Sequence, residues 1–361
     1  MKIIEKSEPR VIMSNPHSHH SYFGWPTVAR LKDGKLAVAA SGFRLGHVCP
    51  FGKTVVSFSY DEGESYTLPA PVIDTPLDDR DGGVTPFGKN GVIVTSFNNS
   101  AKFQREEGEG GALRDAYLDR LTPEEEEKYL GADFRVSLDG GITFGERIYK
   151  SPVTSPHGPL ETSDGRLIWV GRTYSPDDSQ RVEDCIRAYE IDPDGFSMTC
   201  LGEIENILCE GMRPLSCEPH TVELPSGRLL THIRVQNKSP KLFTTYQSIS
   251  DDGGRSWSQP RPILPELGGA PSHILRHSSG VLVATYGHRE EPYGIRAMLS
   301  RDGGESWDTG YVLFTGVSKD LGYPSTVELG DGSMITVFYA KEQADGPAKI
   351  MQVKWRFEDE I

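Results

Sequence analysis

The sequence predicts an all-β protein built as a six-bladed β-propeller, with a short helical insertion in the second blade. Three observations lead to this prediction: four copies of one turn motif, six strand–turn–strand units, and an abundance of turn residues. There are 39 glycines and 25 prolines among 361 residues. Both residue types concentrate in tight turns, so their number favours many short strands. We expect a single domain over residues 1–361.

The turn motif reads Ser-x-Asp-x-Gly-x-x-aromatic. In such a turn the Ser and Asp side chains bond the local backbone, the glycine supplies a positive φ, and the aromatic ring packs beneath the hairpin. One octapeptide of this kind is weak evidence, whereas four copies favour a repeat architecture. We expect a structural role for the copies, which are Ser59–Tyr66, Ser137–Phe144, Ser250–Trp257 and Ser300–Trp307.

The strand–turn–strand units place alternating apolar residues on both sides of a short polar turn, which is the pattern of a β-hairpin. Successive turn glycines lie roughly 50 to 75 residues apart, which leaves room for a four-stranded blade in each unit. We expect the ring to close when residues near Ile350–Phe357 pair with an N-terminal strand. The six turn glycines are Gly34, Gly91, Gly165, Gly227, Gly280 and Gly332.

The repeat is interrupted at about residues 100–131. Thr122 is followed by Pro123 and by four glutamates, which is typical of a helix start with an N-cap, a proline at the first position and acids in the first turn. This segment predicts a helical insertion within the second blade. We expect a solvated excursion; a lid or a dimer contact is the alternative.

Charge and composition exclude several classes of partner. The net charge of −14 argues against a nucleic-acid or anionic-membrane surface. The five cysteines form no C-x-x-C pair, and the run His17–His20 has no carboxylate or cysteine fixed beside it, so we expect no metal and no other cofactor. With no signal-peptide pattern near Met1, a cytoplasmic location is expected. The oligomeric state is not readable.

Residues at the propeller axis can be compared between blades. The first strand of each blade lines the axis, so the residue nine positions before each turn glycine marks one level of the ring. Polar groups crowded there cost desolvation energy unless they bind something. A binding mouth is therefore expected, with a solvated funnel of paired charges as the alternative. The six residues at this level are Trp25, Gly82, Pro156, Glu218, Pro271 and Tyr323. Their neighbours, and the arginines that end the second strands, are Asp81, His157, His220, His273, Arg44, Arg172, Arg234 and Arg289.

The turn motif and the axial residues resemble those of the sialidase superfamily, in which the motif is the Asp-box of the outer strands. Glu218, followed by Arg234 one hairpin later, is similar to the Glu–Arg pair of the fourth sialidase blade. Arg296 fits a further arginine before the last Asp-box, and Tyr323 fits the nucleophile of the final blade. The resemblance covers nearly the whole chain.

This resemblance implies covalent catalysis by a tyrosine. Tyr323 would attack the anomeric carbon, and Glu218 would take its proton, because a phenol with a pKa near 10 is a poor nucleophile by itself. Arg234 and Arg296 would hold the substrate carboxylate by bidentate hydrogen bonds. A tyrosine suits a substrate whose own carboxylate would repel an Asp or Glu nucleophile.

Two parts of the sialidase set are missing. Phe23-Gly24-Trp25-Pro26 stands where sialidases have Phe/Tyr-Arg-Ile-Pro, and no Asp follows Arg44 in Leu45–Pro50. We expect His47 first, and Asp81 second, to protonate the leaving oxygen. Arg172 or Arg289 could replace the missing arginine or form salt bridges. Trp25 could stack on a sugar or be buried.

These features predict an exo-acting glycoside hydrolase that removes a terminal acidic sugar, such as a sialic, ulosonic or uronic acid, from an oligosaccharide or glycan. The mouth residues Arg44, His157, His220 and His273 are expected to contribute to substrate binding. Two alternatives stay open. One is a uronate-directed lyase or histidine-dependent glycosidase on the same propeller; the other is a glycan-binding propeller without catalysis.

Overall fold

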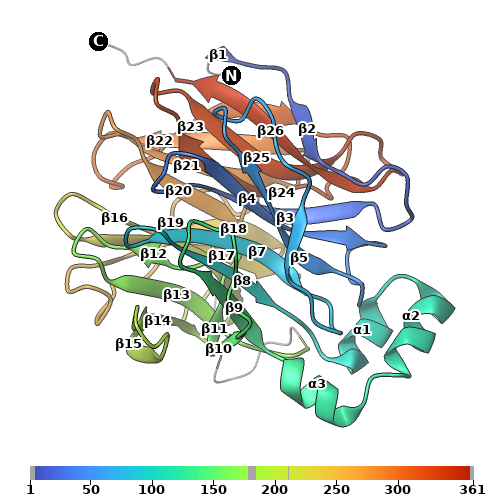
Figure 1. Cartoon of the computed structure of the whole chain (residues 1–361). Helices are drawn as coiled ribbons and strands as arrows, with labels where there is room; N and C mark the ends of the chain where they lie inside the picture. The colour runs from blue at the N-terminus through green and yellow to red at the C-terminus, as the bar shows by residue number, and fades with distance from the viewer. Residues whose placement is uncertain (1–4, 178–183, 210, 358–361) are drawn as a thin grey trace.

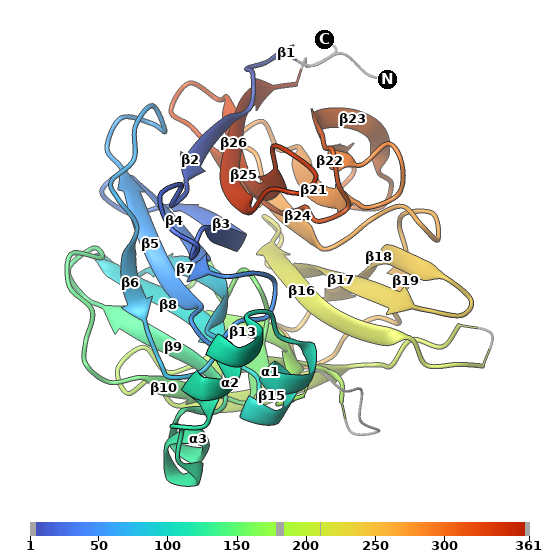
Figure 2. The same cartoon turned by 90° about the vertical axis from the view of Figure 1, so that its right-hand side faces the viewer.

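The computed structural model describes residues 5–177, 184–209 and 211–357. Within these residues, six antiparallel sheets form the blades of a β-propeller, so the predicted fold class is confirmed. Figures 1 and 2 show the blades following one another around the ring in chain order, from blue to red. In each blade the first strand is innermost and successive strands pair outwards.

The first three blades are built from residues 22–204. Blade 1 contains β3 (Tyr22–Arg30), β4 (Leu36–Arg44), β5 (Lys53–Ser59) and β6 (Ala70–Ile73). Blade 2 contains β7 (Arg80–Phe87), β8 (Gly91–Phe97), β9 (Ala132–Ser137) and β10 (Tyr149–Ser151). Blade 3 contains β13 (Leu167–Thr173), β14 (Ile186–Ile191) and β15 (Met198–Ile204), and its inner strand is split into β11 (Val153–Thr154) and β12 (Leu160–Glu161).

The last three blades follow the same plan. Blade 4 contains β16 (Leu215–Glu223), β17 (Leu229–Asn237), β18 (Leu242–Ser250) and β19 (Arg261–Pro262). Blade 5 contains β20 (Ser272–Arg276), β21 (Leu282–His288), β22 (Gly294–Ser300) and β23 (Asp308–Thr315). Blade 6 contains β24 (Gly322–Glu328), β25 (Met334–Lys341) and β26 (Ala348–Arg356), completed by β1 (Glu5–Lys6) and β2 (Arg10–Met13).

The ring closes where the N-terminal strands join the last blade. Glu5 pairs with Arg356, and Arg10 pairs with Gln352, both in antiparallel register. The expected closure is therefore confirmed. Because β1 and β2 are supplied from the beginning of the chain, blade 6 cannot form its outer edge until both ends of the sequence meet.

The hydrophobic core is divided among the interfaces between blades. Six clusters of buried side chains are found in the described residues, one for each neighbouring pair of blades. The cluster between blades 1 and 2 contains Ala39 and Val94, for example, and the one between blades 6 and 1 contains Val38 and Val337. Each blade therefore buries both of its faces against its neighbours.

Each Asp-box connects the third and fourth strands of its blade, in blades 1, 2, 4 and 5. In the first copy, the Ser59 hydroxyl donates to Asp61 at 2.8 Å and accepts from the Gly63 amide at 2.8 Å. Hydrogen bonds from Ser65 and Ser59 lower the pKa of Asp61 to about 2. Since strands alternate in direction, these turns lie on the face opposite to the start of the first strands.

The insertion lies between β8 and β9 of blade 2 and contains α1 (Ala101–Glu107), α2 (Gly111–Leu118) and α3 (Pro123–Tyr129). The helix start at Thr122 is confirmed, with Thr122 and Glu125 forming a capping box. The insertion projects from the ring in Figure 1. It is not simply solvated, because Glu109 accepts from the Val48 amide at 2.8 Å and its own amide donates to the Val48 carbonyl at 2.9 Å.

Candidate active site

Four inner strands carry the same irregularity where they begin at the axis. In each, the pairing with the second strand shifts by one residue, which is a β-bulge. In blade 4, for example, Cys217 pairs with Arg234 and His220 with His232, so three steps on β16 match two on β17. A bulge of this kind redirects a side chain at the rim of a sheet. The bulged residues, with φ between 48° and 53°, are Trp25, Asp81, Glu218 and Tyr323.

The bulge corrects the position that the sequence suggested for blade 2. Counting back from Gly91 selected Gly82, but Asp81 is the residue equivalent to Glu218 and Tyr323. Val28 pairs with Val38, and Val84 pairs with Val94, so the two hairpins have equal length. The turn glycine of blade 2 simply stands one position later in its turn.

Tyr323, Glu218 and Arg234 form a closed set of hydrogen bonds. The Tyr323 hydroxyl donates to Oε1 of Glu218, and Nη1 of Arg234 donates to Oε2 of the same carboxylate at 2.5 Å. The same Nη1 lies 3.0 Å from the Tyr323 oxygen. The structure therefore brings together the tyrosine, carboxylate and guanidinium that the sequence singled out from three distant segments.

Electrostatics in this set keep the phenol neutral until a base removes its proton. Burial, and next the charge of Glu218, raise the pKa of Tyr323 well above its ordinary value. Burial works against the charge of Arg234, but Glu218 and Tyr323 outweigh it and raise the pKa of the guanidinium. A neutral phenol hydrogen-bonded to a carboxylate is the arrangement that an activated tyrosine nucleophile requires.

Asp81 lies at the wall of a narrow cavity of about 70 Å³. Glu218 and Arg234 also line this cavity. Burial, and next the charge of Glu218, raise the pKa of Asp81 to about 7. A carboxyl group with this pKa holds its proton near neutral pH and can release it during a reaction.

Arg289 shares the floor of the site with Arg234. Their guanidinium groups lie 5.3 Å and 5.0 Å from the centre of the Phe243 ring, and Arg289 also lies 5.8 Å from the centre of the Tyr323 ring. Arg289 donates to the Leu321 carbonyl at 3.0 Å and to the Tyr339 hydroxyl at 3.2 Å. These neutral acceptors fix its orientation without neutralising its charge.

Arg296 does not reach this floor, contrary to our expectation. It lies on β22, the third strand of blade 5, where it donates to the Pro292 carbonyl at 3.3 Å. Its side chain lines a separate cavity beside Tyr286 and His288. The resemblance suggested Arg296 from its position before the last Asp-box. The arginine at the site is instead Arg289, which directly follows β21, one strand closer to the axis.

His47 lies on the opposite wall with Asp320. Tyr22 donates to Asp320 at 3.0 Å and lies 3.3 Å from Nδ1 of His47, and the His47 ring is 3.8 Å from Asp320. Partial desolvation lowers the pKa of His47, against the effect of Asp320, although 46% of its side-chain surface is exposed and this limits the effect. His47 is therefore mainly neutral at pH 7, which weakens it as an acid.

Trp25 and Arg44 are buried rather than presented to a ligand. Trp25 is 1% exposed and lies between the guanidinium groups of Arg80 and Arg44, at 4.5 Å and 4.8 Å from its ring. Arg44 is completely buried and pairs with Asp78 at 2.6 Å. Of the two expectations for Trp25, burial is the one observed. The placement of Arg44 at the mouth was wrong, because Asp78 holds its side chain inside the protein.

Arg172 is mostly buried in an ion pair but still lines a cavity. It lines the narrow cavity with Asp81 and Glu218, and its Nη2 lies 3.2 Å from Asp184. Both side chains are at least nine-tenths buried. An ion pair thus engages Arg172, and any role with a ligand would be shared with Asp184.

The three histidines of the inner strands lie beneath the floor. The rings of His220 and His273 stack at 4.0 Å, and His157 meets them at 5.3 Å and 5.0 Å. Backbone amides of Ile274 and Thr326 donate to Nδ1 of His220 and His273. Burial lowers the pKa of all three rings, so they are neutral. They line neither cavity of the site, and among the described residues no group of His, Cys, Asp or Glu is arranged to hold a metal ion.

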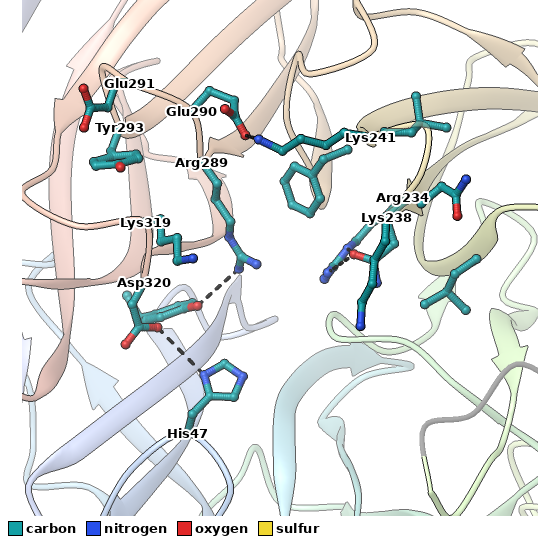
Figure 3. A pocket seen from close by; sticks show the side chains of 16 residues that line it. His47, Arg234, Lys238, Lys241, Arg289, Glu290, Glu291, Tyr293, Lys319 and Asp320 are labelled. Atoms are coloured by element: carbon teal, nitrogen blue, oxygen red, sulfur yellow. Dashed lines mark hydrogen bonds and ion pairs between the residues drawn. The ribbon is translucent and has the colours of Figure 1, made fainter. Parts of the chain in front are cut away.

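The main cavity has a volume of about 1230 Å³ and opens above Arg234 and Arg289. Figure 3 shows Arg234 and Lys238 on one side, His47 and Asp320 on the other, and Arg289 between them. Several lining residues were not anticipated from the sequence, because they stand on connections or on second and third strands rather than on inner strands. These are Gln236, Lys238, Lys241, Phe243, Glu290, Glu291, Tyr293, Lys319, Asp320 and Tyr339. The only available signal was their position next to Arg234, Arg289 and Tyr323 in the chain.

Comparison with solved structures shows the same fold in proteins of low sequence identity. A protein of unknown function from Dyadobacter fermentans is 20% identical, with a TM-score of 0.77, and the match covers 98% of this chain and 99% of that one. The NanB sialidase from Streptococcus pneumoniae is 13% identical, with a TM-score of 0.68, over 96% of this chain and 70% of that one. An α-L-arabinanase from Penicillium chrysogenum is 14% identical, with a TM-score of 0.64, over 98% of both chains.

No curated protein sequence matches the chain. No helix in the described part of the chain is long and apolar enough to cross a membrane. The family model of the BNR repeat-like domain matches residues 122–337, which is more than half of the sequence. The chain shares its propeller fold with solved sialidases, and the family-model match shows that it belongs to the BNR repeat-like family.

Proposed function

We propose that the protein is an exo-acting glycoside hydrolase that removes a terminal acidic sugar from a glycan. The observation that carries the proposal is the hydrogen-bonded set of Tyr323, Glu218 and Arg234, with Arg289 beside it on the cavity floor. A structural role alone does not account for a buried tyrosine on a strained bulge bonded to a carboxylate.

Substrate binding is assigned to the two arginines of the floor. Arg289 has no carboxylate partner among the residues that the structure describes, and its planar guanidinium suits the carboxylate of an acidic sugar. Arg234 is already bonded to Glu218 but faces the main cavity as well. An acidic sugar held here would place its anomeric carbon near Tyr323.

Catalysis then follows in two steps. In the first, Tyr323 attacks the anomeric carbon while Glu218 accepts the phenolic proton, Arg234 stabilises the developing charge, and Asp81 protonates the departing oxygen. In the second, Asp81 takes a proton from water, which attacks the glycosyl–tyrosine bond, and Glu218 returns its proton to the phenolate. One water is consumed and both carboxyl groups recover their starting states.

The relatives with solved structures support this choice of reaction class. They include sialidases, an intramolecular trans-sialidase from Ruminococcus gnavus and an arabinanase, which act on glycosidic bonds with the same propeller. A histidine-dependent mechanism has less support, because the axial histidines line neither cavity and would not contact a substrate there.

The test is a mass-spectrometric product screen against acidic oligosaccharides, with wild type, Tyr323→Phe and Tyr293→Phe in parallel. Tyr293 lines the main cavity but makes no hydrogen bond with Glu218, so its substitution controls for the loss of a hydroxyl. We expect release of a terminal acidic sugar by wild type and Tyr293→Phe, and a loss of at least about a thousandfold in Tyr323→Phe.

Other outcomes would redirect the proposal. Equal release by all three proteins would remove Tyr323 from the mechanism. An unsaturated product absorbing in the ultraviolet would indicate a lyase. Tight binding without any product over the whole panel would indicate a binding propeller.

A further inference from the structure

The main cavity carries an excess of positive charge on a strongly acidic protein. Its charged side chains, apart from histidine, are five cations, Arg234, Lys238, Lys241, Arg289 and Lys319, and three carboxylates, Glu290, Glu291 and Asp320. The chain as a whole has a net charge of −14. The local sign is therefore opposite to that of the molecule, which concentrates anions at this opening and repels them elsewhere.

Internal pairing neutralises only part of this set. Lys241 pairs with Glu290 at 2.6 Å, and Asp320 is engaged by Lys341 at 3.4 Å. Arg234 is bonded to Glu218. In the parts of the chain that the structure describes, no carboxylate pairs with the remaining cations, Lys238, Arg289 and Lys319.

These three cations stand at two levels. Arg289 lies on the floor, against the rings of Phe243 and Tyr323. Lys238 and Lys319 are exposed residues of the rim, on the turn between β17 and β18 and in the segment before β24. Figure 3 shows the two lysines on opposite sides of the cavity with Arg289 between them. An anion on the floor and a second anion at the rim would satisfy all three.

The size of the cavity agrees with a ligand longer than one sugar. Its volume of about 1230 Å³ is above the range of roughly 300–1,000 Å³ that is usual for small-molecule sites. We propose that the substrate is a polyanionic oligosaccharide, in which the sugar next to the terminal acidic residue also carries a negative group, and that Lys238 and Lys319 recognise this second charge. This inference rests on the proposed function and names its substrate class.

The experiment compares substrates that share a terminal sugar and differ in the charge of the next one. The probes are α-2,8-linked disialic acid against 3′-sialyllactose, and digalacturonic acid against the same disaccharide with the carboxylate of its second sugar methyl-esterified. Each is assayed for kcat/KM and, in the Tyr323→Phe background, for binding by calorimetry. The proteins are wild type, the double variant Lys238→Gln/Lys319→Gln, and Lys89→Gln as control, since Lys89 is an exposed lysine on a blade 2 turn outside the cavity.

We expect wild type to prefer the diacidic probe, and the double variant to lose about five- to twentyfold in kcat/KM on that probe alone. The preference should disappear in about 0.5 M salt, because the Debye length is then only a few ångströms and the rim charges are screened. Turnover with no preference between the probes, or equal losses on both, would overturn this inference and leave the hydrolase proposal standing. Charge-dependent binding of the diacidic probe without turnover would support the rim site and overturn the hydrolase.

Discussion

At the scale of single residues, the site works by separating the protonation states of neighbouring groups. Tyr323, Glu218 and Asp81 stand on three blades, at equivalent bulges. Burial, and next the charge of Glu218, raise the pKa of both Tyr323 and Asp81, so the phenol and the Asp81 carboxyl keep their protons. In the proposed mechanism, one carboxylate therefore acts on both the nucleophile and the acid.

The choice between Asp81 and His47 as the acid can be tested directly. Asp81→Asn should lower kcat/KM by about 10²- to 10⁴-fold on a natural substrate and by much less on a 4-nitrophenyl glycoside, whose leaving group needs no proton. Because the acid must be protonated and the pKa of Asp81 is raised to about 7, wild-type activity should decline as the pH rises through about 7. Leaving-group dependence and pH profiles measure both effects.

His47→Gln serves as the comparison, because His47 lines the main cavity rather than the narrow one and contacts Tyr22 rather than Glu218. It should lower activity without removing the fall above pH 7. If His47→Gln abolishes that fall and Asp81→Asn retains it, the imidazole is the acid and the assignment must be reversed.

At the scale of elements, the connections on the two faces of the ring have different tasks. Asp-box turns on one face stabilise the outer hairpins through side chain–backbone bonds, whereas loops on the other face build the site. The helical insertion belongs to the second group, since Glu109 is bonded to Val48, one residue from His47. A segment of blade 2 therefore helps to hold a loop of blade 1 at the cavity wall.

An Asp-box substitution should separate stability from activity. Ser250 is buried, accepts from the Gly254 amide at 2.9 Å and donates to Asp252 at 2.9 Å. Ser250→Ala leaves that amide without its acceptor and should lower the free energy of unfolding by about 1–2 kcal/mol, measured by urea denaturation, with kcat unchanged. Ser226→Ala, at an exposed turn of the same blade, should change it by less than about 0.5 kcal/mol. A large loss of kcat in Ser250→Ala would contradict a structural role.

At the scale of the whole molecule, the ring depends on apolar interfaces that also enclose histidines. His157, His273 and His232 are all at least nine-tenths buried, and burial lowers the pKa of each. A histidine that is neutral in the folded state and charged in the unfolded one destabilises the fold as the pH drops below its unfolded pKa, about 6.5. The raised pKa values of Asp79 and Asp133 act in the opposite direction.

A single substitution isolates the histidine effect. The pKa of His232 is lowered to about 3 by burial, against a weaker effect of Gln247. Wild type should lose about 1.4 kcal/mol per pH unit below pH 6.5 through this group, so the difference in unfolding free energy between wild type and His232→Asn should shrink from pH 7.5 to pH 5. His19→Asn, at an exposed position, should show no such change. A difference independent of pH would mean that the pKa of His232 does not change on folding.

Much of the fold is determined by the sequence itself, because its signals are local. The Asp-box, the strand alternation around each turn glycine and the helix start at Thr122 each depend on neighbouring residues, and all three are found where the pattern placed them. Glu218, Arg234 and Tyr323 could also be identified, since each lies at a fixed offset from a turn.

Other features were decided only by the tertiary structure, because they depend on which strands meet. The one-position shift of the blade 2 turn glycine selects Asp81, and the end of β21 brings Arg289 to the floor in place of Arg296. A buried ion pair with Asp78 keeps Arg44 away from the mouth. Lys238 and Lys319, which are far apart in the sequence, line the same cavity. The position of a residue along one strand can be counted from the sequence. The charged residues that it meets from another blade are set only when the ring closes.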